Sequence, residues 1–341
     1  MKILSIMRNG NPRTIGGIET FNRNLKKMFP EEVIFFAKPL VKELSYFNVE
    51  DVIEYKEHNF FIKKIFKKKF LLRMALKKLK TDIYILNTVG DFKVISDKNK
   101  KYIFVQHMNF EEWIGRKSKK EINKNIEKLD YFVFLSEFDK KRFLKELNFP
   151  EEKAVVIRHT SELELLSEKK IKNKNLIMIC RLDNRQKRLD LAIKAMRKLK
   201  DFTLNIYGSG QDREYLENII KENNLKNVIL HGGTNQIKEK LDENSIFIMT
   251  SDYEGYGITN IEAMRKGLPI ILRNTFDAAP DIVQNNGILL NKEWNEDKFI
   301  EAVSEVYNNY DYYSENSLKM GKRHNFEVIK KEWEKLFKSL K

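Results

Sequence analysis

The chain has 341 residues, 42% of them hydrophobic, which is enough for two domains of roughly 150 residues with cores of their own and excludes a disordered chain. Its single cysteine excludes a disulfide framework and fits a reducing compartment. No apolar run approaches the ~20 residues that a transmembrane helix needs.

The formal net charge of +15 is distributed unevenly along the chain. Residues 1–160 carry 34 Lys and Arg against 21 Asp and Glu, a balance of +13, whereas residues 161–341 carry 30 against 28, a balance of +2. Nearly all the basic excess therefore lies in the first half. This asymmetry predicts an anionic partner for the N-terminal domain.

The first predicted unit is a strand at residues 2–7, a loop at 8–17 and an amphipathic helix at 18–29. The opening strand is too brief for a signal peptide. The loop ends in Gly16 and Gly17, which allow the backbone to approach a ligand closely. An ordinary strand-to-helix turn is the alternative for this pair.

Strands and helices alternate through the rest of the first half, which is typical of a parallel sheet with helices on both faces. Further strands are predicted at residues 33–37, 83–86, 102–105, 131–135 and 154–157. Ligands of such sheets bind beyond the carboxyl ends of the strands. His107 follows one of these strands, so it is a candidate functional residue; a structural histidine is the alternative.

The segment at residues 62–80 contains nine basic residues and no acidic one, with apolar residues at roughly helical spacing. Its candidate membrane or acceptor patch consists of Lys63, Lys64, Lys67, Lys68, Lys69, Arg73, Lys77 and Lys78. A basic amphipathic helix of this kind can lie on an anionic membrane surface. A helix with a solvated basic face is the alternative. A nucleic-acid groove is not expected, because no aromatic stacking platform or known motif accompanies the charge.

Residues 161–174 are highly charged and lack a strand pattern, which places a domain boundary there. We predict an N-terminal acceptor-binding domain at residues 1–165 and a C-terminal donor-binding domain at residues 166–323. A final helix at about residues 324–341 is expected to pack back on the first domain. Strands in the second half are predicted at residues 175–180, 202–207, 228–230, 245–249 and 269–272, and helices at 189–199, 211–223, 237–241 and 257–266.

The most informative stretch is residues 251–269, where an apolar strand is followed by a glycine loop and a helix. The start of a helix presents unpaired N–H groups and the positive end of its dipole, which suits a phosphate. Glu254 lies in the loop and Glu262 in the helix, so each acid could contact one end of a bound nucleotide sugar. The alternative is a loop acid and a solvated helix acid.

The second half resembles the retaining glycosyltransferases of the GT-B fold, specifically family 4, also called glycosyl transferases group 1. Four motifs carry the resemblance in the family's order: Arg181-Leu182 with Lys187, the turn Tyr207-Gly208-Ser209-Gly210, His231-Gly232, and Glu254-Gly255-Tyr256-Gly257 through Glu262. The resemblance covers residues 175–290, and in the first half only Gly16-Gly17 and His107 match. It implies two Rossmann-like α/β domains that face each other across a cleft.

The resemblance also implies roles for these residues. Arg181 and Lys187 would stabilise the charge that develops on the departing diphosphate, together with helix-start amides. Glu254 would contact the donor sugar, Glu262 the ribose, and His107 the donor sugar and acceptor. The remaining donor-binding residues would be Gly16, Gly17, Gly208, Gly232, Tyr256, Gly257, Ile258 and Thr259. The spacing from Arg181 to Lys187 is a residue longer than in many members, so Arg185 or Arg188 could share the role of the lysine.

We therefore expect a retaining hexosyltransferase that uses a UDP-sugar and a lipid-linked or polymeric acceptor in bacterial surface polysaccharide or capsule biosynthesis. No metal or other cofactor is expected, since the sequence has no Asp-x-Asp motif and no His/Cys cluster with metal-ligand spacing. The expected location is cytoplasmic and peripheral, on the inner face of the cell membrane. The alternatives are a nucleotide-sugar 2-epimerase with the same fold and a non-catalytic module that binds membrane or nucleic acid.

Overall fold

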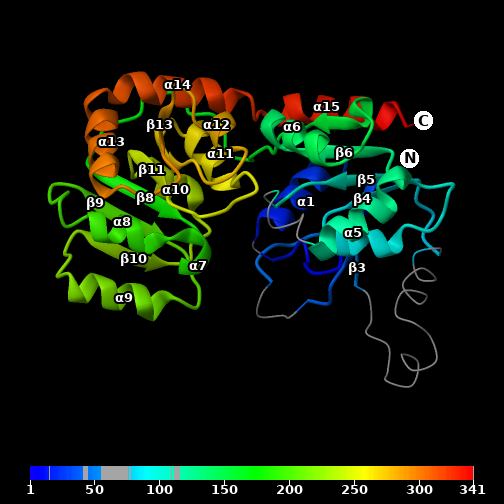
Figure 1. Ribbon diagram of the computed structural model, residues 1–341, viewed down its shortest axis with the longest axis horizontal. Helices are drawn as coiled ribbons and strands as arrows, with labels where there is room; N and C mark the ends of the chain where they lie inside the picture. The colour runs from blue at the N-terminus through cyan, green and yellow to red at the C-terminus, as the bar shows by residue number, and fades with distance from the viewer. Residues whose placement is uncertain are drawn as a thin grey trace. The chain divides into compact units, whose positions relative to one another are not determined.

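A computed structural model describes residues 1–14, 16–40, 45–54, 76, 78–108, 110 and 116–340. The chain divides into two compact units, one formed by Met1–Arg158 with Ile329–Lys341 and the other by His159–Val328. The first connection between the units thus follows residue 158, a few residues before the predicted boundary at 165. Each unit contains a parallel sheet with helices (Figure 1), so the predicted fold class is confirmed.

The first unit contains a seven-stranded sheet in the order β3-β2-β1-β4-β5-β6-β7, in which every neighbouring pair is parallel. The strands are β1 (Ile3–Met7), β2 (Val33–Ala37), β3 (Val52–Glu54), β4 (Ile83–Leu86), β5 (Lys101–Val105), β6 (Tyr131–Phe134) and β7 (Ala154–Val156). The described helices are α1 (Gly17–Met28), α5 (Arg116–Asn125), α6 (Glu137–Glu146) and most of α15 (Phe326–Lys338). The short strand β3 was not predicted.

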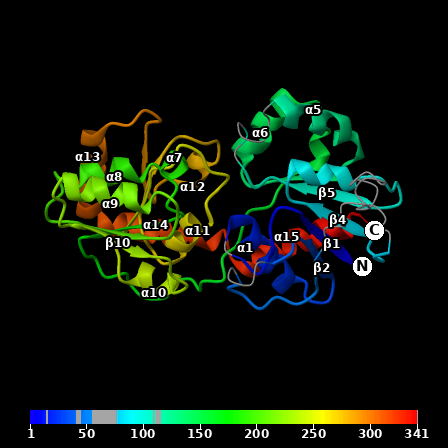
Figure 2. The ribbon, with the colours of Figure 1, turned by 90° about the horizontal axis from the view of Figure 1, so that it is seen from below.

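Helix α15 returns from the second unit to the first, where it lies beside α1 (Figure 2). The ring of Trp333 lies 5.9 Å from that of Phe21, and the ring of Phe337 lies 5.2 Å from that of Phe29. Trp333 and Phe337 are both buried. Apolar burial of this face therefore holds the C-terminal helix on the first unit.

The second unit contains a six-stranded parallel sheet in the order β10-β9-β8-β11-β12-β13. The strands are β8 (Asn175–Ile179), β9 (Thr203–Tyr207), β10 (Val228–Gly232), β11 (Ile246–Met249), β12 (Ile270–Arg273) and β13 (Gly287–Leu290). The helices are α7 (Asn184–Lys187), α8 (Leu189–Ala195), α9 (Arg213–Glu222), α10 (Ile237–Asp242), α11 (Ile258–Arg265), α12 (Ala279–Ile282), α13 (Glu296–Asn308) and α14 (Tyr310–Lys322). Strand β13 and helices α7, α12, α13 and α14 were not predicted.

The strand order of the second sheet determines where a ligand can bind. Strand β8 lies between β9 and β11, so the connections after β8 and β11 lead away in opposite directions. The carboxyl ends of two such strands form the usual binding edge of an open α/β sheet. The two richest sequence motifs follow β8 and β11.

Cys180 directly follows β8 and packs against the core of the second unit. Burial is the largest influence on its thiol and raises the pKa to about 12, against the opposing effect of Lys187. A thiol with so high a pKa is not ionised at neutral pH. Cys180 is therefore a core residue and not a nucleophile.

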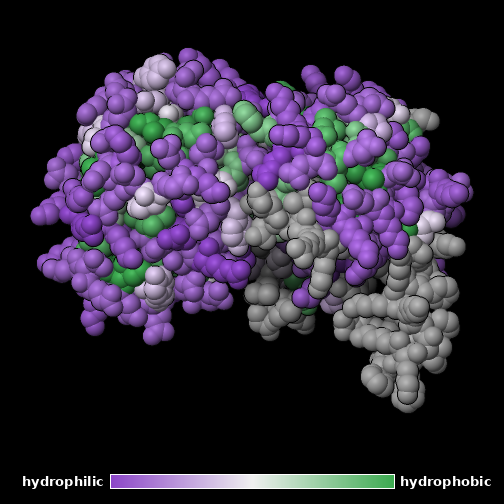
Figure 3. Space-filling view, viewed as in Figure 1, coloured by the Kyte–Doolittle hydropathy of each residue, from purple (hydrophilic) through white to green (hydrophobic). Residues whose placement is uncertain are grey.

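The face of the molecule in Figure 3 is mainly hydrophilic, with apolar residues in small separate areas. In the part of the chain that the structure describes, no helix combines the length and the hydropathy required to cross a bilayer.

Candidate active site

The turn after β8 and the loop after β11 are joined by a lysine and a glutamate. Lys187, the last residue of α7, places its Nζ 2.5 Å from Oε1 of Glu254. Ser251 donates its hydroxyl to the same oxygen at 2.7 Å. The side chains of Lys187 and Glu254 are only 13% and 9% exposed. The structure thus brings together two predicted site residues that lie 67 positions apart in the sequence.

Gln186 fastens the same turn to the loop through its backbone and its side chain. Its carbonyl accepts from the amide of Asp252 at 2.8 Å, and its side-chain Nε2 donates to the carbonyl of Tyr253 at 3.1 Å. Its Oε1 accepts from Nη2 of Arg181 at 2.9 Å. Arg181 also pairs with Asp183 at 3.8 Å, and because its side chain is 65% exposed, its guanidinium remains accessible to an anionic ligand.

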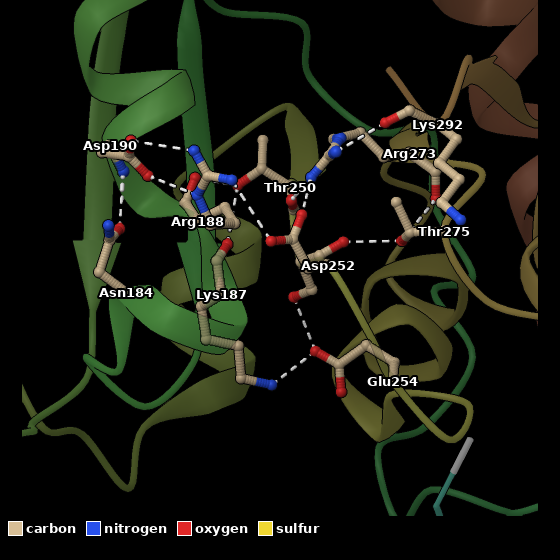
Figure 4. A network of polar contacts seen from close by, with 11 residues as sticks. Asn184, Lys187, Arg188, Asp190, Thr250, Asp252, Glu254, Arg273, Thr275 and Lys292 are labelled. Atoms are coloured by element: carbon tan, nitrogen blue, oxygen red, sulfur yellow. Dashed lines mark hydrogen bonds and ion pairs between the residues drawn. The ribbon is translucent and has the colours of Figure 1, made fainter. Parts of the chain in front are cut away.

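Asp252, in the loop after β11, forms ion pairs with Arg188 and Arg273 (Figure 4). Its Oδ1 lies 2.6 Å from Nη1 of Arg273, and its Oδ2 lies 3.3 Å from Nη1 of Arg188. Arg188 adopts a left-handed conformation with φ 48° and also contacts Asp190 at 3.1 Å. Two carboxylates therefore engage Arg188, which helps to hold the loop, and its contact with a diphosphate stays a prediction.

Hydroxyls and backbone carbonyls complete this support (Figure 4). Thr250 donates its hydroxyl to the carbonyls of Lys187 at 3.0 Å and Arg188 at 2.9 Å, and Thr275 donates to the carbonyl of Ser251 at 2.7 Å. Arg273 donates to the carbonyl of Thr250 at 2.8 Å. The sequence analysis missed this network, although Arg273 is the one charged residue in the otherwise apolar strand β12.

Helix α11 begins beside Glu254. Gly257 caps it with φ 79°, a conformation that favours glycine, and a Cβ there would lie 2.7 Å from Nδ2 of Asn260. The first amides of the helix have no acceptor within it, so Gly257, Ile258 and Thr259 offer N–H donors at its positive end. Glu262 lies within α11 and is half-buried, and its contact with a ribose stays a prediction.

The side chain of Tyr256 does not face this site. It is 1% exposed, and its hydroxyl donates to Oδ2 of Asp281 at 3.1 Å and lies 3.3 Å from Nε2 of His324. The buried side chain is therefore not available to a donor, and a donor contact through the backbone of Tyr256 stays a prediction. The large ring is enclosed by the interior of the unit, an orientation that the motif alone does not reveal.

The turn after β9 passes very close to the chain that leaves β8. A Cβ at Gly208, where φ is 154°, would lie 1.8 Å from the carbonyl oxygen of Cys180, and a Cβ at Gly210 would lie 2.3 Å from that of Leu182. Both glycines are therefore required for this backbone crossing, which supports the residue before Arg181. Direct contact of Gly208 with the donor stays a prediction.

At the end of β10, Gly232 has φ 91°, another conformation that favours glycine. The preceding His231 stacks on Tyr207 with ring centroids 4.4 Å apart, and its Nε2 lies 2.8 Å from Oδ1 of Asn205. Burial, followed by the nearby Lys240, lowers the pKa of His231. The predicted role of Gly232 in binding the donor is not tested by these contacts.

The predicted residues of the first unit lie at the carboxyl edge of its own sheet. Nε2 of His107 lies 2.9 Å from Oδ1 of Asn87, and Nδ2 of Asn87 donates to the hydroxyl of Ser5 at 2.9 Å. Gly16 caps α1, and Gly17 is its first residue. Their roles toward a donor or acceptor stay predictions.

The candidate basic patch falls largely outside the described residues. Only Lys78 lies within them, and it is exposed. The other members, Lys63, Lys64, Lys67, Lys68, Lys69, Arg73 and Lys77, lie outside the part that the structure describes. Within the described ranges, no group of three or more His, Cys, Asp or Glu residues is arranged to hold a metal ion.

The two parallel-sheet α/β units have the architecture of the GT-B fold, and the second carries cationic and acidic side chains at its binding edge. Residues 164–325 match the family model "Glycosyl transferases group 1". This match lies within the second half of the chain and agrees with the resemblance found in the sequence, and a relative is named as a glycosyltransferase, so the prediction of a glycosyltransferase is confirmed.

Individual relatives agree with this assignment. An uncharacterized glycosyltransferase of Haemophilus influenzae is 26% identical over 280 residues, covering 77% of this chain and 78% of its own length. The poly(ribitol-phosphate) alpha-N-acetylglucosaminyltransferase of Staphylococcus aureus is also 26% identical, covering 79% of this chain, which spans only 58% of that enzyme. Anabaena HepE in complex with UDP superposes with a TM-score of 0.82 over 99% of this chain and 100% of its own; at 14% identity this shows the fold alone.

Proposed function

We propose that this protein transfers a hexose, with retention of configuration, from a UDP-sugar to a lipid-linked or polymeric acceptor in the synthesis of a bacterial surface glycan. The observation that carries the proposal is the contact of Lys187 with Glu254 at the binding edge of the second sheet. The exposed Arg181 contacts Gln186, the neighbour of Lys187, and Glu254 lies in the loop that leads to the start of α11. The site thus offers cations and amides for a diphosphate and a carboxylate for sugar hydroxyls.

The chemistry that these groups would perform is charge stabilisation. As the bond between the anomeric carbon and the diphosphate oxygen breaks, its electron pair passes to the leaving group, where Arg181 and Lys187 offset the growing charge. The acceptor oxygen forms the new bond to the same carbon on the same face, and its proton passes to the departing phosphate. Glu254 would orient the sugar. Lys187 would exchange part of its contact with Glu254 for the diphosphate.

The donor and acceptor classes draw on the relatives. The Staphylococcus aureus enzyme is named for a poly(ribitol-phosphate) acceptor and an N-acetylglucosaminyl group, and the Anabaena structure contains UDP. A phosphate-rich polymer or lipid would also suit the basic excess of residues 1–160. The choice between glucose, galactose and an N-acetylated hexose is left to experiment.

A thermal-shift screen tests the donor. A ligand at 100 times its Kd stabilises the folded state by about 2.7 kcal/mol, so a bound nucleotide should raise the melting temperature. Because the proposed donor is a UDP-sugar, UDP and UDP-sugars should raise it more than ADP or GDP. Lys187→Ala should remove the shift. Lys221→Ala is the matched control, because Lys221 is an exposed lysine of the same unit on α9. The absence of any shift with all sugar nucleotides would refute a nucleotide-sugar site.

Product analysis tests the reaction. NMR of the glycosylated acceptor should show the anomeric coupling of the donor, and an inverted product would exclude the retaining mechanism. Turnover should persist in EDTA if the reaction needs no metal. Interconversion of two UDP-sugars without an acceptor would instead identify a 2-epimerase, and donor binding without any turnover would identify a binding module.

We further propose that the protein works on the cytoplasmic side of the membrane and binds its surface through residues 62–80. Replacement of Lys67, Lys68, Lys69, Lys77 and Lys78 with Gln should abolish sedimentation with phosphatidylserine vesicles at low salt. Neutral phosphatidylcholine vesicles are the control. Unchanged sedimentation with the anionic vesicles would refute the membrane role of this segment.

A further inference from the structure

The two connections between the units are bonded to each other within the second unit. The chain enters this unit at His159 and leaves it after Val328. Nδ1 of His324 lies 2.7 Å from the carbonyl oxygen of His159, so this ring nitrogen carries the hydrogen and donates it. Thr160 in turn donates its hydroxyl to the carbonyl of His324 at 2.8 Å. The entering and leaving segments are therefore tied together.

Tyr256 links the loop that carries Glu254 to the same cluster. Its hydroxyl lies between Oδ2 of Asp281, at 3.1 Å, and Nε2 of His324, at 3.3 Å. The rings of Tyr256 and His324 meet edge to face with centroids 5.5 Å apart. Asp281 also accepts from Nη2 of Arg323 at 2.8 Å. The hydroxyl of Tyr256 thus contacts His324 directly and is linked to Arg323 through Asp281.

The hydrogen-bonded cluster around Tyr256 and His324 is buried. His324 is 0% exposed, and Thr160, Tyr256 and Asp281 are also buried. A polar group that loses its partner in such a place costs about 1–3 kcal/mol, so the cluster favours one arrangement of the groups that form it. Tyr256 lies two residues after Glu254 and directly before Gly257, the cap of α11. A shift of the loop would therefore move the hydroxyl relative to its partners.

We infer that Tyr256 is a positioning residue that couples the loop carrying Glu254 to residues 159–160 and 323–324, which lie in the segments that enter and leave the second unit. This inference rests on the proposed function, because the loop is assigned to the sugar nucleotide there. Occupation of the loop restrains the hydroxyl of Tyr256. The hydroxyl restrains His324, and His324 restrains His159 and Thr160. Donor binding thereby orders the connections without touching them.

The test uses Tyr256→Phe in the full chain, which keeps the ring and removes the hydroxyl. Tyr312→Phe is the matched control, because Tyr312 is 55% exposed and lies outside the cluster. Hydrogen exchange is followed with and without saturating UDP-sugar. In the parent protein and in Tyr312→Phe, the donor should slow exchange in peptides over residues 254–262 and also over 159–163 and 320–326. In Tyr256→Phe, it should protect residues 254–262 only.

Steady-state kinetics provides the second readout. Tyr256→Phe should bind UDP within about threefold of the parent but lower kcat by roughly tenfold, a difference of about 1.4 kcal/mol. Should this variant fail to fold, Asp281→Asn tests the same link, since it alters the second partner of the hydroxyl and should weaken the distant protection.

The possible outcomes separate the two proposals. If the parent protein binds no sugar nucleotide, the proposed function fails. If the donor binds the parent but protects only its own loop, or if Tyr256→Phe keeps the full protection of the connections and the parent kcat, the coupling by Tyr256 is refuted while the proposed function stands.

Discussion

Replacement of Gly208 by alanine tests the backbone crossing beneath Arg181. The added methyl carbon would lie 1.8 Å from the carbonyl oxygen and 2.9 Å from the carbonyl carbon of Cys180. Backbone atoms in a parallel sheet cannot move aside as a flexible side chain does. The turn after β9 and the chain leaving β8 must therefore separate, which also displaces the segment that carries Arg181 and Lys187.

Two costs add to the expected destabilisation. Overpacking of a tight interior costs about 1–3 kcal/mol. A non-glycine residue held in an unfavourable backbone region costs about 1–3 kcal/mol more, and φ at Gly208 is 154°. The sum is of the order of 4 kcal/mol. For a unit of this size each kcal/mol lowers the melting temperature by roughly 2–4 °C, so we expect a decrease of the order of 10 °C.

Gly233→Ala is the control for Gly208→Ala. It lies at the end of the neighbouring strand, and its added Cβ would have only one neighbour, Oγ of Ser209 at an ordinary 3.9 Å. Melting temperature and UDP affinity are measured for both variants. Gly208→Ala should lose stability and bind UDP at least tenfold more weakly, whereas Gly233→Ala should keep the parent stability. Equal melting temperatures for the two variants would refute the close crossing.

Three further substitutions test separate parts of the structure. Glu254→Gln should lower kcat/KM about 100-fold, equivalent to about 2.7 kcal/mol, yet preserve or improve UDP affinity because the lysine is released; a loss of UDP binding by titration would contradict this. Asp252→Asn should lower the urea-unfolding free energy by about 2 kcal/mol, since two arginines lose a shared carboxylate that is itself 37% exposed, whereas the exposed Asp201→Asn should have no effect. Burial raises the pKa of Asp91 from 3.8 to about 6, so the folded state keeps a proton that the unfolded chain has lost, and stability should fall as pH rises through this interval. Asp91→Asn should flatten that slope in urea titrations at pH 4 to 7, and an unchanged slope would refute the assignment.

The pattern of apolar and polar residues along the chain was sufficient to predict most strands of the two sheets. Strands β1, β8 and β11 are short runs of buried apolar residues, and their alternation with helices indicates a parallel arrangement. The three-residue β3 and the four-residue β13, which begins at a glycine, carry too little pattern to be recognised. Strand β3 is held by its pairing with β2, and β13 by its pairing with β12, so both strands depend on their neighbours in the sheet.

The sequence by itself also determined that Glu254 follows a strand and precedes a helix start, because glycine and the apolar run are local signals. Only the tertiary structure decided that Lys187 contacts Glu254, that Asp252 is shared by Arg188 and Arg273, and that the ring of Tyr256 faces inward. The physical reason is that a local pattern depends on neighbours in the sequence, whereas the direction and partners of a side chain depend on which distant segments pack against it. Such partners are selected by the whole fold, and no spacing along the chain encodes them.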